Sequence, residues 1–382
     1  MNILFVSNGP VNINNWSGSV FHLYNSVINE RDIVDKCELK DKKLFKIPTK
    51  LYNLVSKNQN VFCRSKIAMK DYAKQITKIL NKKNYDLIVS IGSIPVSMLK
   101  TNIPIIIITD GTFNAIKDYY PEYGKYSKRA LKNSEKFENM ALKKANTLIF
   151  ASEWARDSAV NDYKISPNKT IVCPFGANFE SNLSLEDINK IIDNKINKKT
   201  KLLFVGIDWV RKGGDKTLEI LRYLKHKEND VELHIVGCKP NIPKDLNDCV
   251  ILHGFLNKRN QNELKKIKKL YEECNFFVLP TLAECFGIVF CEASSYGIPS
   301  ITHATGGTTT SVKNNINGFG FKLDSTASEI GDTIISLIND KEKYRKMCIS
   351  SYLYYKEALN WRAAKDTIQE AIYKTYEFNN EG

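Results

Sequence analysis

The sequence of 382 residues lacks the features of a membrane-spanning or secreted chain. Its longest apolar run, from Ile103 to Thr109, is far shorter than the roughly 20 residues that a transmembrane helix requires. The amino terminus reaches Asn8, Gly9 and Pro10 without a basic stretch and an apolar segment before them, so we expect no secretory signal there. These absences predict a protein without a transmembrane helix.

The cysteines offer neither a disulfide framework nor a zinc site. There are nine of them, an odd number, and no two stand in a CxxC pair. Scattered cysteines without a pairing pattern are typical of chains kept in a reducing compartment. The sequence therefore predicts a cytoplasmic protein.

Common nucleotide-binding and metal-binding motifs are missing as well. A GxxxxGK[ST] loop is absent, and no GxGxxG fingerprint follows a predicted strand, which weakens a nicotinamide-dependent alternative. No DxD-like acidic pair has a convincing metal role. We therefore expect neither a cofactor nor a metal.

The net charge of +14 admits two explanations. The lysines are dispersed among many Asn and Ile residues, as a biased codon usage would also produce. If the charge is functional, the segment from Lys40 to Lys50, with Arg64 and Lys66, favours contact with an anionic acceptor or with the inner face of an anionic membrane. We expect no nucleic-acid partner, because the interleaved aromatic motifs of RNA-binding domains are absent.

Short apolar runs alternate with helix-like stretches from end to end, as in parallel strands joined by crossover helices. The predicted fold class is therefore α/β, and the length suggests two domains of about 150 residues each. The predicted helices include 18–29, 69–80 and 127–144. The predicted strands are 2–7, 87–90, 105–109, 147–151 and 170–172 in the first half, and 201–205, 232–236, 250–252, 276–279 and 300–302 in the second.

A polar, Asn-rich stretch at 181–200 separates the two series of strands and has no apolar face wide enough for a core element. We interpret it as a linker between an N-terminal domain, 1–180, and a C-terminal domain, 201–356. The last stretch, 341–379, is predicted to be helical throughout.

In an open parallel sheet ligands bind beyond the carboxyl ends of the strands, so the loops there are candidate sites. The first such loop carries Ser17, Gly18 and Ser19 at the start of a helix. Small residues and the amide groups of a helix start favour a phosphate or an acceptor oxygen. A Gly and a Ser before a helix are also an ordinary N-cap, and this alternative stays open.

The second loop, from Gly206 to Gly214, holds Arg211 and Lys212 beside two glycines. Because it lies directly after a strand and before a helix, its two cations are placed to form a cradle for a diphosphate. A solvated surface turn is the alternative reading of the same residues.

The third segment holds two carboxylates, Glu284 and Glu292. Glu284 follows the strand 276–279, and Glu292 lies at least one turn into the helix that Gly287 admits. The neutral hydroxyl groups of a donor substrate need such hydrogen-bond acceptors. One carboxylate suits the hydroxyls of a sugar ring, and the other suits a ribose diol. A surface acid pair would have polar neighbours, whereas these neighbours are apolar or small. The amide groups at the helix start complete a predicted anion site, made by Cys285, Phe286, Gly287 and Ile288.

Glu284 and Glu292 are separated by seven residues, which resembles the signature of family 4 of the retaining glycosyltransferases. The resemblance covers nearly the whole chain, and 32–85 is the least similar region. It implies a GT-B fold: two Rossmann-like domains with parallel sheets that face each other across a cleft, and a last helix, about 357–382, that returns to the N-terminal domain. Other segments that carry the resemblance are GIPSITHATGG at 297–307, ASEWARDSAV at 151–160, VCPFGAN at 172–178, TDGTF at 109–113 and YYP at 119–121.

Carried over by position, the resemblance implies that Glu292 binds the ribose and that Glu284 lies near the transferred sugar, as does Asp110. Arg211 and Lys212 would clamp the diphosphate. The implied catalytic residues are Glu284, Asp110 and Lys212, and the implied donor-binding residues are Arg211, Lys212, Glu292, Cys285, Phe286, Gly287, Ile288, Gly254 and Phe255.

Two positions depart from the family pattern. Ile207 stands where relatives usually carry an Arg directly after the strand glycine, so the clamp would fall to Lys212 with Arg211 in support. Thr310 stands where the family often has an acid after its glycine pair, which leaves the role of that loop open.

The resemblance implies a hexosyltransferase-type enzyme of class EC 2.4 that acts with retention and without a metal. The expected donor is a nucleotide-diphosphate sugar, a UDP-sugar in the first place, held by the C-terminal domain. The expected acceptor is a hydroxyl of a glycan, lipid-linked or protein-linked molecule, held by the N-terminal domain. Alternatives are another GT-B enzyme, such as a nucleotide-sugar epimerase or a phosphorylase, or a nucleotide-sugar-binding partner subunit with weak catalysis.

Overall fold

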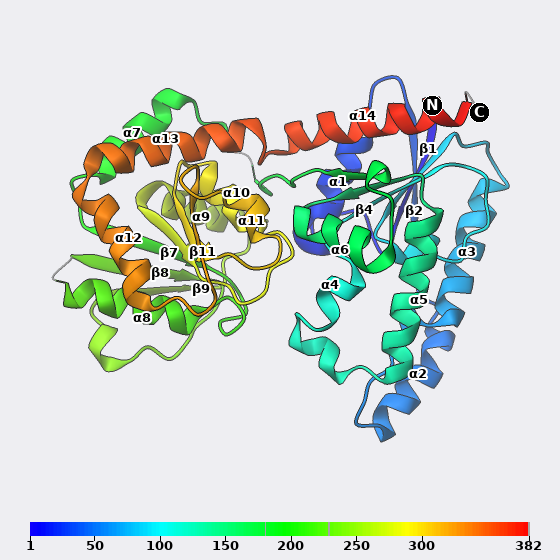
Figure 1. Ribbon diagram of the computed structural model, residues 1–382, viewed down its shortest axis with the longest axis horizontal. Helices are drawn as coiled ribbons and strands as arrows, with labels where there is room; N and C mark the ends of the chain where they lie inside the picture. Colours follow the sequence, from blue (N-terminus) through cyan, green and yellow to red (C-terminus); the bar gives the residue numbers. More distant parts are fainter. Residues whose placement is uncertain (180, 228–229, 381–382) are drawn as a thin grey trace. The chain divides into compact units, whose positions relative to one another are not determined.

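The computed structural model describes residues 1–179, 181–227 and 230–380, and it divides into two compact units. The first unit contains Met1–Asn178 together with the chain from Trp361 onward, and the second contains Phe179–Asn360. Figure 1 shows the two units in the colours of the sequence.

The first unit is built on a six-stranded parallel sheet with the strand order β2-β1-β3-β4-β5-β6. The five strands expected in this half are confirmed. The sequence pattern missed β2, because this edge strand reads IVDKCE and is buried only at Cys37, so it has no continuous apolar run. The strands are β1 (Asn2–Ser7), β2 (Ile33–Glu38), β3 (Leu87–Ile91), β4 (Ile105–Thr109), β5 (Thr147–Phe150) and β6 (Thr170–Val172).

The second unit repeats the architecture, with the strand order β12-β11-β10-β7-β8-β9 and parallel pairing throughout. The five expected strands are confirmed here too. The missed edge strand, β12, contains two glycines in four residues, and glycine is depleted in strands. The strands are β7 (Thr200–Val205), β8 (Val231–Val236), β9 (Val250–Gly254), β10 (Phe276–Leu279), β11 (Ser300–His303) and β12 (Gly318–Phe321).

Several helices of the first unit start at hydroxyl side chains that cap them. Ser65, Ser127 and Ser152 each accept a hydrogen bond from the backbone N–H three residues further on, at 3.1 to 3.3 Å. The three helices expected in this half are confirmed. The helices are α1 (Ser19–Val27), α2 (Lys43–Val55), α3 (Lys66–Leu80), α4 (Phe113–Lys117), α5 (Lys128–Lys144) and α6 (Glu153–Tyr163), with 3₁₀ turns at η1 (Asn15–Gly18), η2 (Phe62–Arg64), η3 (Ile94–Val96), η4 (Pro121–Lys125) and η5 (Pro167–Lys169).

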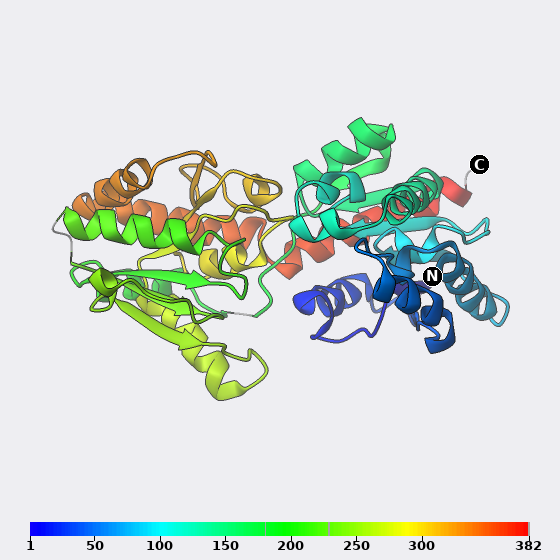
Figure 2. The same ribbon diagram turned by 90° about the horizontal axis from the view of Figure 1, so that it is seen from below.

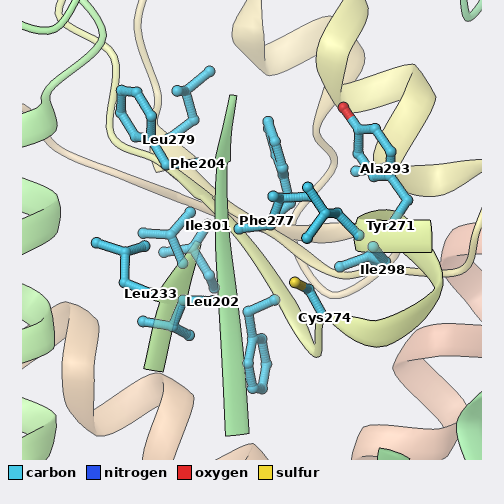
Figure 3. Close-up of a cluster of buried hydrophobic side chains, with 14 of the residues drawn as sticks. Leu202, Phe204, Leu233, Tyr271, Cys274, Phe277, Leu279, Ala293, Ile298 and Ile301 are labelled. Atoms are coloured by element: carbon cyan, nitrogen blue, oxygen red, sulfur yellow. The ribbon is translucent and has the colours of Figure 1, made fainter. Parts of the chain in front are cut away.

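Helices cover both faces of the second sheet (Figures 1 and 2). On one face α8 packs against α12, and on the other α7, α9, α10 and α13 pack with one another. Between them lies an apolar core that includes Leu202, Phe204, Phe277 and Ile301, all fully buried (Figure 3). The helices are α7 (Leu185–Lys195), α8 (Gly214–His226), α9 (Gln261–Glu273), α10 (Ile288–Ser294), α11 (Thr308–Ser311), α12 (Ala327–Asn339) and α13 (Lys341–Glu357), with a 3₁₀ turn at η6 (Lys244–Leu246).

The interpretation of 181–200 as a linker without a core element is wrong. Ser184 and Asp187 form a capping box that starts α7, and the side chains of Ile188 and Ile192 are fully buried in the core of the second unit. Two isoleucines at i and i+4 are enough to anchor this helix, although the Asn, Asp and Lys residues around them hide the pattern in the sequence. The second unit therefore begins before 201.

The carboxyl-terminal stretch is two helices and not one. The side-chain amide of Asn360 donates to the carbonyl oxygens of Tyr355 and Lys356, at 2.7 and 2.9 Å, where α13 ends. The next helix, α14 (Trp361–Asn380), belongs to the first unit. The amide of Gln369 on α14 donates to the carbonyl oxygens of Ser26 and Val27 at the end of α1, both at 2.8 Å. The expected return of the last helix to the N-terminal domain is confirmed.

Candidate active site

Three loops of the second unit emerge at the same edge of its sheet. They follow β7, β9 and β10, and parallel strands place their carboxyl ends at one edge. They contain the predicted clamp, the predicted donor residues Gly254 and Phe255, and the predicted acid Glu284. The topology therefore places the candidate donor residues of this unit in one region.

The predicted clamp and the predicted sugar acid form a single cluster of charges. Lys212 donates to the carboxylate of Glu284 in a direct ion pair, and a guanidinium nitrogen of Arg211 lies 3.7 Å from the same carboxylate. The same nitrogen donates to the carbonyl oxygen of Ala283 at 2.8 Å, while the exposed Asp208 balances Arg211 from the other side at 3.3 Å. The sequence predicted these residues separately but did not predict their pairing.

Close packing of two loops holds this cluster in place. The backbone N–H of Leu282 donates to the carbonyl oxygen of Arg211 at 2.8 Å, and the hydroxyl of Thr281 donates to the same oxygen at 3.1 Å. Gly213 has a φ of 72°, and a Cβ there would lie 1.9 Å from the carbonyl oxygen of Pro280. Only glycine fits this approach, which explains the glycine beside the clamp.

The backbone around Glu284 is fixed from the loop after β11. The N–H of Gly307 donates to the carbonyl oxygen of Glu284 at 2.9 Å, and the hydroxyl of Ser311 donates to that of Phe286 at 2.6 Å. The ring of Phe286 is buried in the protein, so of this residue only the main chain can serve a ligand. Gly287, with a φ of 87°, caps α10. The anion site expected at this short helix stays a prediction.

Glu292 lies in a different environment from Glu284. It is fully buried on α10, where the hydroxyl of Tyr271 donates to one carboxylate oxygen at 3.0 Å and Lys258 forms an ion pair with the other. Burial, followed by the charge of Glu292, raises the pKa of Tyr271 well above its usual value, so this tyrosine stays a neutral donor. A buried carboxylate requires such partners, since a buried charge without them is costly.

Lys258 is a candidate functional residue that the sequence analysis missed. It lies in the loop after β9, and its ammonium group is also 5.2 Å from the centre of the Phe179 ring. The only sequence signal was its place after a strand, which is weak in a chain with so many lysines. In the same loop, Gly254 ends β9 with a φ of 67°, and Phe255 is an exposed aromatic ring.

The Ser17–Ser19 loop of the first unit has an unusual backbone. Trp16 and Ser17 have φ angles of 51° and 55°, which non-glycine residues rarely adopt and which recur at ligand-binding sites. The side chain of Asn178 supports the loop by donating to the carbonyl oxygen of Ser17 at 2.5 Å, and the indole of Trp361 donates to Asn178 at 3.2 Å. Ser17 is exposed, whereas Gly18 and Ser19 are buried. Gly18 is the N-cap residue of α1, with a φ of 99° and no side-chain cap, so the ordinary N-cap alternative stays open.

Asp110 directly follows β4 and is half-buried. A buried acid that the sequence analysis missed, Glu138 on α5, supports the next turn of chain. It accepts hydrogen bonds from the N–H of Phe113, from the hydroxyl of Ser93 at 2.9 Å and from that of Tyr163 at 2.6 Å. Burial raises the pKa of Glu138. The loop after Asp110 is therefore anchored from beneath.

The two departures from the family pattern differ in consequence. Ile207 is exposed beside the clamp and contributes no charge. Thr310 is buried, and its carbonyl oxygen accepts a hydrogen bond from the hydroxyl of Tyr354 at 3.2 Å. Position 310 thus supports the loop through its main chain.

Neither a group of metal-ligating side chains nor a membrane-spanning helix occurs in the part of the chain that the structure describes. Within 1–179, 181–227 and 230–380, no three His, Cys, Asp or Glu side chains are grouped so that they could hold a metal ion. Among the helices of these ranges, none combines the length and the apolar character needed to span a bilayer.

Two doubly wound units, one of them with paired cations and carboxylates at its carboxyl edge, define a protein of the GT-B architecture. The family model described as "Glycosyl transferases group 1" matches residues 186–352, from the start of α7 almost to the end of α13. The match lies within the second unit and covers less than half of the whole chain.

The fold is similar to those of solved glycosyltransferases. Sucrose-phosphate synthase from Thermosynechococcus elongatus matches with a TM-score of 0.67 and 16% identity over 99% of each chain. Anabaena Alr3699/HepE, solved in complex with UDP, matches with a TM-score of 0.66 and 18% identity over 98% of this chain and all of that one. Among curated proteins, the uncharacterized glycosyltransferase YqgM of Bacillus subtilis is 24% identical over 55% of this chain. The chain spans about half the length of the curated relatives that it matches.

Proposed function

We propose that this protein is a retaining glycosyltransferase that moves a sugar from a UDP-sugar to a hydroxyl of a glycan, lipid-linked or protein-linked acceptor. The observation that carries the proposal is the cluster of Lys212, Arg211 and Glu284 in the same unit as the buried acid Glu292. The group 1 match supports the reaction class, and Anabaena HepE, which has this fold, was solved in complex with UDP and glucose.

In this proposal the donor lies along the carboxyl edge of the second sheet. Glu292 accepts hydrogen bonds from the ribose diol, and the exposed ring of Phe255 stacks on the base. Lys212, supported by Arg211, binds the diphosphate. Glu284 lies at the sugar, where its carboxylate stabilises positive charge on the ring.

The reaction breaks the bond between the anomeric carbon and the phosphate oxygen, and the electron pair leaves with the diphosphate. The acceptor hydroxyl attacks from the same face, so the configuration is retained, and its proton passes to the leaving phosphate oxygen. Fixed cations stabilise the growing negative charge without reorganisation, which lowers the barrier. We assign Asp110 to the sugar, and Ser17, Gly18 and Ser19 to the acceptor or a phosphate.

Because Lys212 and Arg211 supply positive charge at the diphosphate, we propose that the reaction needs neither a metal nor another cofactor. The proposed partners are the nucleotide-sugar, the acceptor and an anionic membrane at its cytoplasmic face, the last on the ground of the net charge of +14. We propose no nucleic-acid partner.

The first test is a thermal-unfolding panel with UDP, GDP, ADP and CDP. At about 100 times its dissociation constant a ligand adds roughly 2.7 kcal/mol to the free energy of unfolding, which raises the melting temperature measurably. We expect UDP to give the largest shift in the wild type and none in Lys212→Met. If no nucleoside diphosphate shifts the transition, the proposal is wrong.

Turnover separates the proposal from its alternatives. Radiolabelled UDP-sugars are incubated with the protein and candidate acceptors, and NMR of the product gives its anomeric configuration. Retention in a new glycosidic bond supports the transferase. An isomerised nucleotide-sugar indicates an epimerase, phosphate-dependent release of sugar phosphate indicates a phosphorylase, and nucleotide binding without turnover indicates a binding subunit.

A further inference from the structure

Helix α2 is the least buried long helix of the first unit. None of its 13 residues is buried, yet it carries several large apolar side chains. Leu54 and Val55 are 80% and 88% exposed, and Leu44, Ile47 and Leu51 are also exposed. Exposed apolar side chains that form one contiguous surface indicate a binding site, whereas apolar residues scattered singly do not.

The exposed apolar residues of α2 form one stripe. A helix turns by about 100° per residue, so positions three or four apart share a face. Leu44, Ile47, Leu51, Leu54 and Val55 have this spacing. We call these five residues the apolar stripe.

The remaining side of α2 is attached to the first unit. Phe45 packs against the core cluster of this unit. The side chain of Asn53 donates to the carbonyl oxygen of Asn60 at 2.9 Å and accepts from its N–H at 2.8 Å. Figure 1 shows α2 at one end of the first unit, beyond the ends of its neighbours α3 and α5. The helix is therefore held on one side and presents the apolar stripe on another.

Lysines border the apolar stripe along its length. Lys43, Lys46 and Lys50 each precede a stripe residue, and Lys57 follows the helix, which contains no acidic residue. Lys46 pairs with Asp41 at 2.8 Å. Over the ranges that the structure describes, no carboxylate pairs with Lys43, Lys50 or Lys57. Apolar side chains bordered by lysines match a surface that is anionic outside and apolar inside.

We propose that α2 docks on an anionic lipid bilayer, with the apolar stripe buried among the acyl chains and Lys43, Lys50 and Lys57 at the lipid phosphates. Interfacial helices bind in this way, through buried apolar area together with attraction to anionic lipids. A protein partner fits less well, because the border of the stripe has one sign of charge only. Helix α2 is thus the element that makes the membrane contact proposed above, and this role does not depend on glycosyl transfer.

The test is co-sedimentation of the full chain with two kinds of vesicle. One contains phosphatidylcholine alone, and in the other about one lipid in three is phosphatidylglycerol, an anionic lipid that attracts lysines. Leu51→Gln/Leu54→Gln should lower the affinity for anionic vesicles at least tenfold, since burial of a leucine side chain stabilises by about 1.5 to 3 kcal/mol. Lys43→Gln/Lys50→Gln should lower it by about fivefold per lysine. High salt should weaken but not abolish wild-type binding.

The matched control is Leu323→Gln/Leu353→Gln, which removes two half-exposed leucines from the second unit and should bind vesicles like the wild type. Far-UV circular dichroism and thermal unfolding verify that every variant folds. Equal binding by the stripe variant and the wild type, or no vesicle binding at all, overturns the inference. So does a wild-type dimer that the stripe variant abolishes, because the stripe then covers a second copy. The shift of the melting temperature by UDP is measured separately, so a failure of vesicle binding can be told apart from a failure of the proposed function.

Discussion

The two units share a six-stranded parallel architecture, although their strand orders differ, and their loops carry different residues. In the second unit the loops at the carboxyl edge hold Lys212, Arg211 and Glu284 in one charge cluster. In the first unit the corresponding loops hold neutral Ser17–Ser19, on a strained backbone braced by Asn178, and Asp110. A parallel sheet therefore places the sites at the carboxyl ends of its strands, whereas the loop residues decide the chemistry of each site.

A second contrast lies within the second unit. Glu284 is 14% exposed at its side chain and is paired with cations of the clamp, while Glu292 is fully buried and paired with Lys258 and Tyr271. We expect the partly exposed acid to act in the transition state and the buried acid to act in binding.

The largest expected effect is that of Glu284→Gln on turnover. Because the carboxylate is proposed to stabilise charge that develops only in the transition state, kcat should fall by about 10²- to 10³-fold, the usual cost of one such electrostatic group. UDP affinity should not weaken, since Lys212 is then released for the diphosphate. Steady-state rates and calorimetric titration with UDP measure both quantities. The control is Asp208→Asn, an exposed acid whose carboxylate pairs with Arg211 at 3.3 Å, and it should retain most of the activity.

The next effect is that of Glu292→Gln on nucleotide binding. Loss of a charge-assisted hydrogen bond to the ribose, about 1.5 to 3 kcal/mol, should weaken UDP and donor alike by about 10- to 100-fold, with kcat little changed. Binding of 2′,3′-dideoxy-UDP should be insensitive to the substitution. Equal losses of affinity in Glu284→Gln and Glu292→Gln, with kcat intact in both, would show that Glu284 is assigned wrongly.

A smaller effect of opposite sign is expected for Lys258→Met. In the unliganded protein Lys258 pairs with the carboxylate that the ribose is proposed to use, so it competes with the ligand. For a partly exposed lysine the pair contributes up to about 1 kcal/mol, and its removal should tighten UDP binding up to fivefold. The affinity for 2′,3′-dideoxy-UDP should not increase in this variant. Lys268→Met, near the same Phe179 ring, is the control, and weaker UDP binding in Lys258→Met would mean that Lys258 binds the nucleotide itself.

The smallest expected effect is that of chelation. Because Lys212 and Arg211 are proposed to replace a metal at the diphosphate, initial rates in excess EDTA should equal those in untreated protein. Rates that collapse in EDTA and recover with Mg²⁺ or Mn²⁺ would contradict the proposal that two cationic side chains suffice.

The sequence by itself determined most of the regular structure. Buried strands such as β4, with Ile105 to Ile108, read as apolar runs because both faces of a parallel sheet are covered. The sequence also predicted that Arg211, Lys212 and Glu284 lie in loops after strands, where ligands of a parallel sheet bind. Local patterns report local structure.

Only the tertiary structure decided which side chains meet. Lys212 and Glu284 are 72 residues apart, and Lys258 and Glu292 are 34 apart, so no spacing in the sequence could pair them. The role of α7 as a core element also depends on distant partners, since Ile188 and Ile192 are buried by strands and helices that follow much later. Burial and ion pairing are properties of neighbours in space, and the fold alone sets those neighbours.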